Sequence, residues 1–379
     1  MFFWITGLVL FFPIVFFKSF FIKMTILAYS YPIWLLSGYA YGLPASRIVS
    51  HIGNKYYDDL YMEGFIYAFL SYIGFLIVIR KLKEKEYQFY KLKIGILGRT
   101  LLFLLFIVFV AVAYPKSLGL ASYRFGSLGG VVVFLGALTL VTTTNTKWSN
   151  IITLLFFILI LFIVIRGERV DFILMLVSFI IFKYMQSNVK IFKFFIISLG
   201  TLILAVTAGF IRSGVDIDFI FLFQALPRVM MNFGTAVDVI HVYMSSVWYY
   251  YNVGVTIEPL INIVFSYIPL FGDRGVSSEL NFTRILIPYI KNLGGGLFYS
   301  VGMMSAGGIG VVLFGILFGY IFKKLFLLRG IYSLLFITFF ILQFRFQWYG
   351  VTYYSSPLIF SILFIVLLHF HKAHMRSSL

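Results

Sequence analysis

Residues 94–114 read IGILGRTLLFLLFIVFVAVAY, and residues 80–93, directly before them, read RKLKEKEYQFYKLK. A helix needs about 20 consecutive apolar residues to cross roughly 30 Å of hydrocarbon, so residues 94–114 are predicted to span a membrane. The preceding stretch carries six Lys or Arg and two Glu. Positive charge beside a span marks its cytoplasmic side, so the loop at residues 80–93 is predicted to be cytoplasmic.

The composition extends this interpretation to the whole chain. Of the 379 residues, 61% are hydrophobic and 11% are charged, and the mean hydropathy is +1.01. A soluble globule cannot bury so much apolar surface, so we expect an all-α polytopic membrane protein. The net charge of +17 comes largely from Lys and Arg beside the predicted spans, so no nucleic-acid partner is expected. The chain has no cysteine, which excludes a disulfide, a thiolate nucleophile and a Cys metal site.

The same pattern recurs along the chain and predicts about 11 transmembrane helices. They cover residues 2–17, 24–41, 61–79, 94–114, 125–144, 151–165, 172–185, 194–211, 297–322, 331–343 and 354–368. These spans divide the chain into N-terminal transmembrane helices (residues 1–211, about 8), an outer loop domain (residues 212–296) and C-terminal transmembrane helices (residues 297–379, about 3). Two alternatives remain for residues 1–42: two spans, or one span and an interfacial segment with Met1 inside.

The outer loop at residues 212–296 is apolar enough to resemble further spans. The turn within it at residues 252–258 has no Lys or Arg, and Asp238 and His241 would lie near mid-membrane, where ionisable groups are costly. Trp248 and the tyrosines at 249–251 suit the depth of the lipid headgroups. This loop is therefore predicted to fold into interfacial or re-entrant helices.

Lysine and arginine are sorted between the two predicted faces. The inner face carries 14 Lys and 4 Arg, whereas the outer face carries 9 Arg and 3 Lys. Lysine suffices for orientation, but the planar guanidinium fork suits bidentate binding of phosphate or carboxylate. The outer face is therefore the candidate anion site. Its first candidates are Arg166, Arg169, Arg212, Arg284 and Arg345, and further candidates are Arg228, Arg274, Gly294 and Gly295.

The tightest charge cluster, RGERVD at residues 166–171, has two interpretations. It forms an ion-paired turn between two helix ends, or Arg166 and Arg169 face an anion pocket and are held there by Glu168 and Asp171. Arg345, in an apolar helix, either reaches the outer headgroups or faces such a pocket.

Three residues are candidates for a general base: Glu168, His241 and Glu258. His241 follows Asp238 by three residues, a spacing that equally fits a structural hydrogen bond. The five histidines are divided between the two predicted faces, so no metal site is expected. The sequence contains no nucleotide-binding glycine loop.

These features resemble the Wzy-type O-antigen and oligosaccharide repeat-unit polymerases of bacterial inner membranes. The resemblance lies in the number of spans, the large late loop, the hairpin at 166–171, GGGLFYS at 294–300 leading into GGIG at 307–310, and Arg284 ahead of Gly295, a spacing similar to an Arg-x10-Gly pattern. Many members carry a carboxylate in the helix after the glycines, where this chain has VGMM at 301–304. No catalytic role is therefore transferred to that helix.

The resemblance implies a metal-independent glycosyltransferase of the bacterial inner membrane, without a cofactor and with a periplasmic active site. It would transfer a growing glycan from undecaprenyl pyrophosphate to a new lipid-linked repeat unit. The arginines would bind the pyrophosphate, and Glu168, His241 or Glu258 would accept the proton of the attacking hydroxyl. Implied partners are undecaprenyl pyrophosphate-linked oligosaccharides, membrane lipids, a chain-length-determining co-polymerase and a flippase. An O-antigen ligase and a lipid-linked oligosaccharide flippase remain alternatives.

Overall fold

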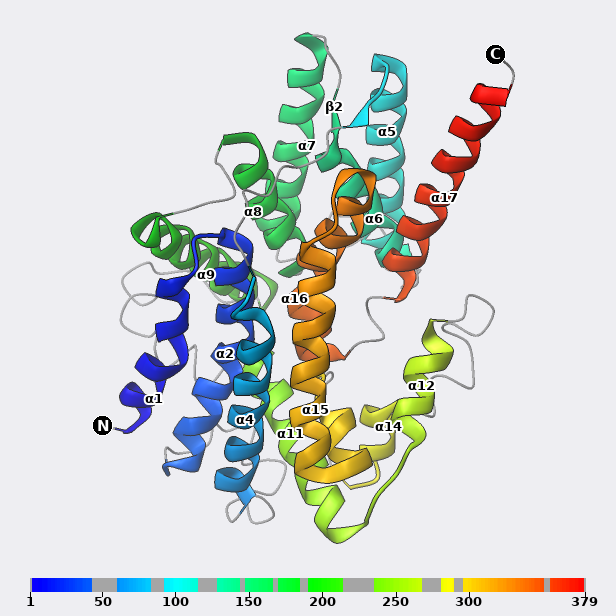
Figure 1. The fold of residues 1–379 in the computed structure, drawn as a ribbon. Helices are drawn as coiled ribbons and strands as arrows, with labels where there is room; N and C mark the ends of the chain where they lie inside the picture. Colours follow the sequence, from blue (N-terminus) through cyan, green and yellow to red (C-terminus); the bar gives the residue numbers. More distant parts are fainter. Residues whose placement is uncertain are drawn as a thin grey trace. The chain divides into compact units, whose positions relative to one another are not determined.

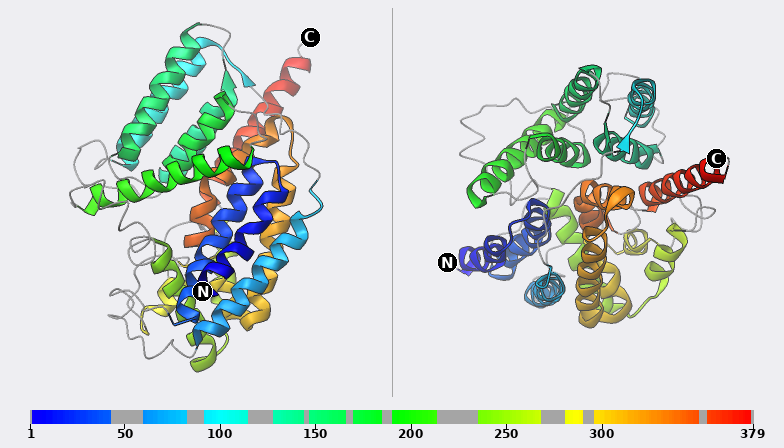
Figure 2. Two further views of the ribbon diagram at one scale, coloured as in Figure 1. Left: turned by 90° about the vertical axis from the view of Figure 1, so that its left-hand side faces the viewer. Right: turned by 45° about the horizontal axis from the view of Figure 1, so that its top comes forward.

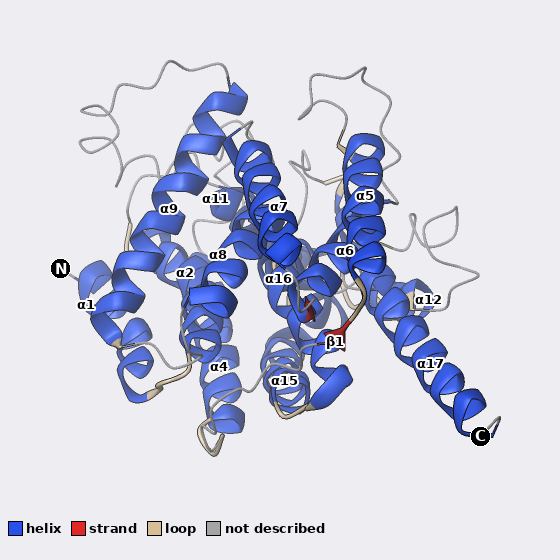
Figure 3. Ribbon diagram, turned by 90° about the horizontal axis from the view of Figure 1, so that it is seen from above, coloured by secondary structure: helices blue, strands red, loops and turns tan. Residues whose placement is uncertain are grey.

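The computed structural model describes residues 2–42, 60–82, 92–114, 128–143, 147–165, 170–184, 190–213, 235–267, 281–289, 296–350 and 355–377. Within these ranges the regular secondary structure is helical, apart from a short parallel pairing of β1 (Leu92–Lys93) with β2 (Thr142–Thr143) (Figure 3). Leu92 pairs with Thr142 and Lys93 with Thr143. The expected all-helical class is therefore confirmed for the described residues.

The helices follow one another along the chain as coloured in Figure 1. They are α1 (Phe2–Phe11), η1 (Phe12–Phe16), α2 (Phe20–Ala40), α4 (Tyr61–Ile79), α5 (Ile96–Ala113), α6 (Gly129–Val141), α7 (Lys147–Ile165), α8 (Val170–Tyr184), α9 (Ile191–Ser213), α11 (Thr235–Asn252), α12 (Glu258–Ser266), α14 (Phe282–Leu286), α15 (Ser300–Phe326), η6 (Gly330–Tyr332), α16 (Ser333–Tyr349) and α17 (Ser355–Ser377).

Five helices in the described part of the chain are long and apolar enough to cross a membrane: Phe20–Ala40, Tyr61–Ile79, Ile96–Ala113, Ser300–Phe326 and Gly330–Trp348. Shorter apolar helices occupy the other predicted spans, at Phe2–Phe16, Gly129–Val141, Asn150–Ile165, Phe172–Ile181, Ile191–Thr201 and Ser355–Phe370. The 13 residues of α6 extend only about 20 Å, short of a roughly 30 Å hydrocarbon layer. The long helices suggest a membrane-embedded protein, but the prediction of about 11 spans is not supported.

The chain forms two compact units that do not follow its linear order. Unit 1 contains Met1–Lys85, Ile217–Lys324 and Gln343–Tyr353, and unit 2 contains Glu86–Asp216, Leu325–Leu342 and Tyr354–Leu379. The predicted division at residues 211 and 296 follows the sequence, whereas these units group segments that pack together.

Unit 1 is built around α2, which lies beside α1 and α4 (Figure 2) and also packs on α11. Tyr29 of α2 is fully surrounded: its ring stacks on Phe75 with centroids 5.0 Å apart, and its hydroxyl lies 2.5 Å from Ser71 Oγ. Pro32 lacks the N–H that would bond to the carbonyl of Ala28. The indole Nε1 of Trp348, at the end of α16, donates to that carbonyl at 3.5 Å. The distant helix end therefore takes the place of the missing backbone donor.

Unit 2 contains a buried arginine at the start of α5. Arg99 is 5% exposed, and its Nη1 donates to the Thr142 carbonyl at 3.0 Å while its Nη2 donates to Thr153 Oγ1 at 2.6 Å. A buried guanidinium is costly unless its donors are satisfied. Arg99 thus joins α5, β2 and α7 through hydrogen bonds to neutral oxygens.

Candidate functional site

Helix α15 is interrupted at the glycines that close the motif at 294–310. Ala306 (φ −153°, ψ 21°) and Gly307 (φ 61°, ψ −149°) both leave the helical conformation. The backbone region of Gly307 is one that only glycine adopts without strain. We name this break, Ala306 and Gly307, the α15 elbow. The predicted span at 297–322 is therefore not one straight helix.

The two arms of the elbow touch through glycines. A Cβ built on Gly302 would lie 2.5 Å from the carbonyl oxygen and 2.6 Å from the carbonyl carbon of Gly310. Residues eight positions apart in a straight helix would be separated by about 12 Å along its axis. The contact shows that the chain folds back on itself here, and two residues without side chains permit it.

Tyrosine rings cover the bare backbone of the elbow. A Cβ on Gly307 would lie 2.6 Å from Cζ of Tyr250, and one on Gly308 would lie 2.5 Å from Cδ1 of Tyr67. Tyr67 comes from α4 and Tyr250 from α11, so the elbow brings together three helices that are distant in sequence. The glycines at 307 and 308 are needed for both the turn and the ring contacts.

A carboxylate completes this arrangement. The hydroxyls of Tyr67 and Tyr251 both donate to Oε1 of Glu63, the first at 2.7 Å, and the two phenolic oxygens lie 3.1 Å apart. The rings of Tyr250 and Tyr251 are nearly perpendicular, with centroids 5.2 Å apart. Burial and the neighbouring Glu63 carboxylate raise the pKa of the Tyr251 hydroxyl, so it remains a donor at neutral pH. We call Glu63, Tyr67, Tyr250 and Tyr251 the Glu63 cluster.

The Glu63 cluster is open to a ligand. Tyr251 is 46% exposed, and Glu63, Tyr67 and Tyr250 are half-buried. Among the described residues, none donates a hydrogen bond to Oε2 of Glu63. A carboxylate oxygen beside exposed aromatic rings can accept a hydroxyl hydrogen while the rings pack against an apolar sugar face.

The elbow also anchors the chain that follows α11. Breaking a helix removes the backbone donor four residues ahead of each affected carbonyl. The amide of Thr256 donates to the carbonyl of Met304 at 3.0 Å, which supplies that missing partner. This bond fixes the connection between α11 and α12, and Glu258 follows two residues later at the start of α12.

The predicted anion and base residues are only partly described. Arg166, Glu168, Arg169, Arg228, Arg274, Gly294 and Gly295 lie outside the described residues. Arg212 lies in the last turn of α9 in unit 2, whereas His241, Glu258, Arg284 and Arg345 lie in unit 1.

His241 and Glu258 occupy contrasting environments. His241 is 3% exposed in α11, and burial lowers the pKa of its imidazole to about 4. The ring is therefore neutral at pH 7 and surrounded by protein. Glu258 is exposed in the first turn of α12, where the helix dipole favours its negative charge. Of the two, Glu258 is the one that a ligand can reach.

The residues just before α15, from Gly296 to Phe298, form hydrogen bonds to the last turn of α16. The amide of Gly296 donates to the Trp348 carbonyl at 3.0 Å, and the amide of Phe298 donates to the Gln347 carbonyl at 2.9 Å. A Cβ on Gly296 would lie 2.6 Å from Cε2 of Phe282. Gly296 is thus required for close packing, and these bonds satisfy carbonyls that the helix end leaves free. Arg345 lies half-buried in the turn of α16 just before them.

Arg284 is exposed on the short helix α14. Asn281 caps this helix, since its Oδ1 accepts a hydrogen bond from the amide of Thr283 at 3.0 Å. α14 packs on α11, so Arg284 is presented from the same unit as the Glu63 cluster.

The sequence interpretation missed Glu63 as a site residue. The available signal was its spacing from Tyr67, since residues four apart share a helix face. The second phenol, Tyr251, is 188 residues away, and no local pattern connects it with Glu63. Within the described ranges, no three His, Asp or Glu residues are grouped so that they could hold a metal ion.

Comparisons of this chain with protein-family models, curated proteins and solved structures give no match. The candidate site is therefore defined by its residues alone.

Proposed function

We propose that this chain is an integral-membrane glycosyltransferase, an O-antigen-type repeat-unit polymerase. It would transfer a growing glycan from undecaprenyl pyrophosphate to a new lipid-linked repeat unit on the periplasmic face of the bacterial inner membrane. The observation that supports this proposal best is the Glu63 cluster, in which a half-buried carboxylate lies among tyrosine rings that a ligand can reach.

The chemistry assigns one task to the carboxylate. The acceptor sugar hydroxyl would donate to Glu63, which takes the proton as the acceptor oxygen bonds to the anomeric carbon of the donor. The bond from that carbon to the pyrophosphate oxygen breaks at the same time, and the pyrophosphate leaves with the electron pair. Tyr67 and Tyr251 already donate to Oε1, so Oε2 is the oxygen that would receive the proton.

The leaving group requires positive charge. Pyrophosphate gains negative charge as the glycosidic bond breaks, and guanidinium groups stabilise such charge through bidentate hydrogen bonds. Arg284 and Arg345, which both belong to unit 1, would supply this charge, and Arg166, Arg169 and Arg212 remain predicted contributors. The half-buried ring of Tyr250 and the exposed ring of Tyr251 would pack against sugar faces.

The first test is genetic. In a strain with this gene deleted, the lipopolysaccharide should collapse to core bearing one repeat unit, and the ladder should return on complementation. Complete loss of surface O units would favour the flippase or ligase alternative. An unchanged ladder would exclude the chain from this pathway.

The second test locates the base. Glu63→Gln should reduce elongation by roughly 10²-fold or more, the usual contribution of a general base, with the protein still inserted in the membrane. Tyr251→Phe should reduce elongation, whereas Tyr289→Phe is the matched control because both tyrosines are 46% exposed. If Glu258→Gln abolishes elongation and Glu63→Gln does not, Glu258 is the base instead.

A further inference from the structure

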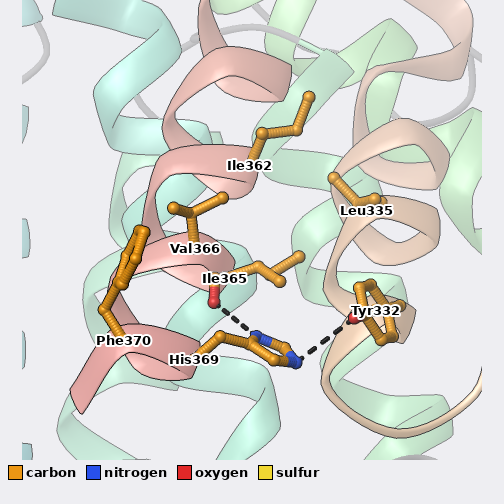
Figure 4. Close-up of a pocket in the computed structure, with 7 residues that line it drawn as sticks. All are labelled: Tyr332, Leu335, Ile362, Ile365, Val366, His369 and Phe370. Carbon is orange, nitrogen blue, oxygen red and sulfur yellow. Dashed lines mark hydrogen bonds between the residues drawn. The ribbon is translucent and has the colours of Figure 1, made fainter. Parts of the chain in front are cut away.

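A groove of about 570 Å³ lies in unit 2 between η6, the start of α16, and α17 (Figure 4). Its walls are apolar, with Leu335 on α16 and Ile362, Val366 and Phe370 on α17. Val366 and Phe370 are 42% and 70% exposed, so the groove opens onto the outer surface of the helices. The volume lies within the usual range for small-ligand pockets, about 300–1,000 Å³.

One end of this groove is polar. Nδ1 of His369 lies 2.8 Å from the carbonyl oxygen of Ile365, and because a carbonyl only accepts, Nδ1 carries a hydrogen. In the neutral ring Nε2 is then an acceptor, and the hydroxyl of Tyr332 lies 3.2 Å from it. Figure 4 shows both bonds, with the ring and the phenol facing each other across the groove. The pair presents polar atoms beside a run of apolar side chains.

The chain around the groove carries only positive charge. Beyond Glu279 the sequence has no Asp or Glu. Arg329 lies three residues before Tyr332, and its Nη1 donates to the carbonyls of Phe326 and Leu328, both at 3.2 Å. Lys372 and Arg376 follow His369 in α17, one and two turns further along.

We propose that this groove binds an anionic glycerophospholipid. One acyl chain would lie along Ile362 and Val366. The phosphate would lie beside Tyr332, whose hydroxyl would turn away from Nε2 of His369 and donate a hydrogen bond to a phosphate oxygen. Arg329, three residues before Tyr332, would supply the opposite charge. Basic pockets between helices on the cytoplasmic side of a membrane bind anionic headgroups in this way, and this end of the chain belongs to the lysine-rich face that the sequence predicts to be cytoplasmic. This proposal does not depend on the proposed function.

The test uses the full-length protein, delipidated in a neutral detergent. It is mixed with equal amounts of phosphatidylglycerol and phosphatidylcholine with identical acyl chains, and the retained lipid is quantified by mass spectrometry. Phosphatidylglycerol should be retained at least about fivefold over phosphatidylcholine, the factor that one basic residue near a membrane surface supplies.

Two variants distinguish lipid bound in the groove from lipid bound elsewhere on the apolar surface of the protein. Val366→Trp should fill the groove and remove the preference for phosphatidylglycerol, whereas Leu367→Trp should keep it, because Leu367 is 65% exposed on the same helix and does not line the groove. If Val366→Trp does not fold, Tyr332→Phe serves in its place and should lower the preference at least twofold to threefold, as loss of one hydrogen bond predicts.

Three outcomes would overturn the proposal. Equal retention of the two phospholipids would remove the anionic specificity. An equal loss in the Val366→Trp and Leu367→Trp variants would show that the groove is not the binding site. In a parallel mixture, retention of undecaprenyl phosphate in preference to phosphatidylglycerol would show that the groove serves the polyprenyl carrier instead.

Discussion

Replacing Gly302 by alanine should destabilise the protein, because the new methyl group has no room at the α15 elbow. Its Cβ would lie 2.5 Å from the carbonyl oxygen of Gly310, whereas an ordinary contact is about 3.5 Å. The two arms would have to separate by about 1 Å, and no rotamer change relieves the clash because both partners are backbone. Overpacking of this kind costs up to about 3 kcal/mol, while alanine gains about 1 kcal/mol in helix propensity. We expect a net loss of about 2 kcal/mol.

The free energy of unfolding can be measured by titrating SDS into detergent micelles that contain the folded protein. The matched control is Gly200→Ala in α9, since no neighbouring atom of the described residues lies within 4 Å of a Cβ at Gly200. That variant should be as stable as the wild type or up to about 1 kcal/mol more stable. If the Gly302→Ala variant matches the wild type within about 0.5 kcal/mol, the close contact of the two arms is refuted.

Three further changes test other parts of the fold. Burial lowers the pKa of His241 to about 4, so stability from its neutral ring is full above about pH 6.5 and is lost as the pH falls toward 4, by at most about 3 kcal/mol. His241→Phe should flatten this part of the curve of unfolding midpoint against pH; unchanged slopes would contradict it. Thr153→Val should cost about 1–3 kcal/mol, since it removes an acceptor of the buried Arg99, and a neutral result in the SDS titration would mean that Arg99 finds another partner. Gly136→Ala should cost less than about 1 kcal/mol, because its Cβ would meet the flexible end of Met175, with the sulfur at 2.5 Å; a larger loss would show that this side chain cannot move.

The positions of the apolar helices could be predicted from the sequence, but the lengths of only some of them could. Residues 61–79 were predicted and observed with the same bounds, and residues 94–114 form α5 at Ile96–Ala113. Residues 125–144 were predicted as one span, yet α6 ends at Val141 because Thr142 and Thr143 pair with Leu92 and Lys93. Hydropathy averages over a run of residues, and it does not register a partner strand elsewhere in the chain.

The candidate site was predictable only in part. The glycine pattern at 307–310 was recognised, but glycine is also common in uninterrupted transmembrane helices, so the pattern alone did not indicate a break. Glu63 and Tyr67 share a helix face, whereas the approach of Tyr251 depends on how α11 packs against α4.

The sequence by itself determined the class of this protein, an apolar helical chain with several helices suited to a membrane. That inference succeeds because the transfer of each side chain into hydrocarbon and the hydrogen bonding of a helix are local properties that add along the chain. Only the tertiary structure decided where α15 turns and which carboxylate meets the phenols. Those features arise from contacts between α4, α11 and α15, and contact energies between distant segments are not encoded in any local run of residues.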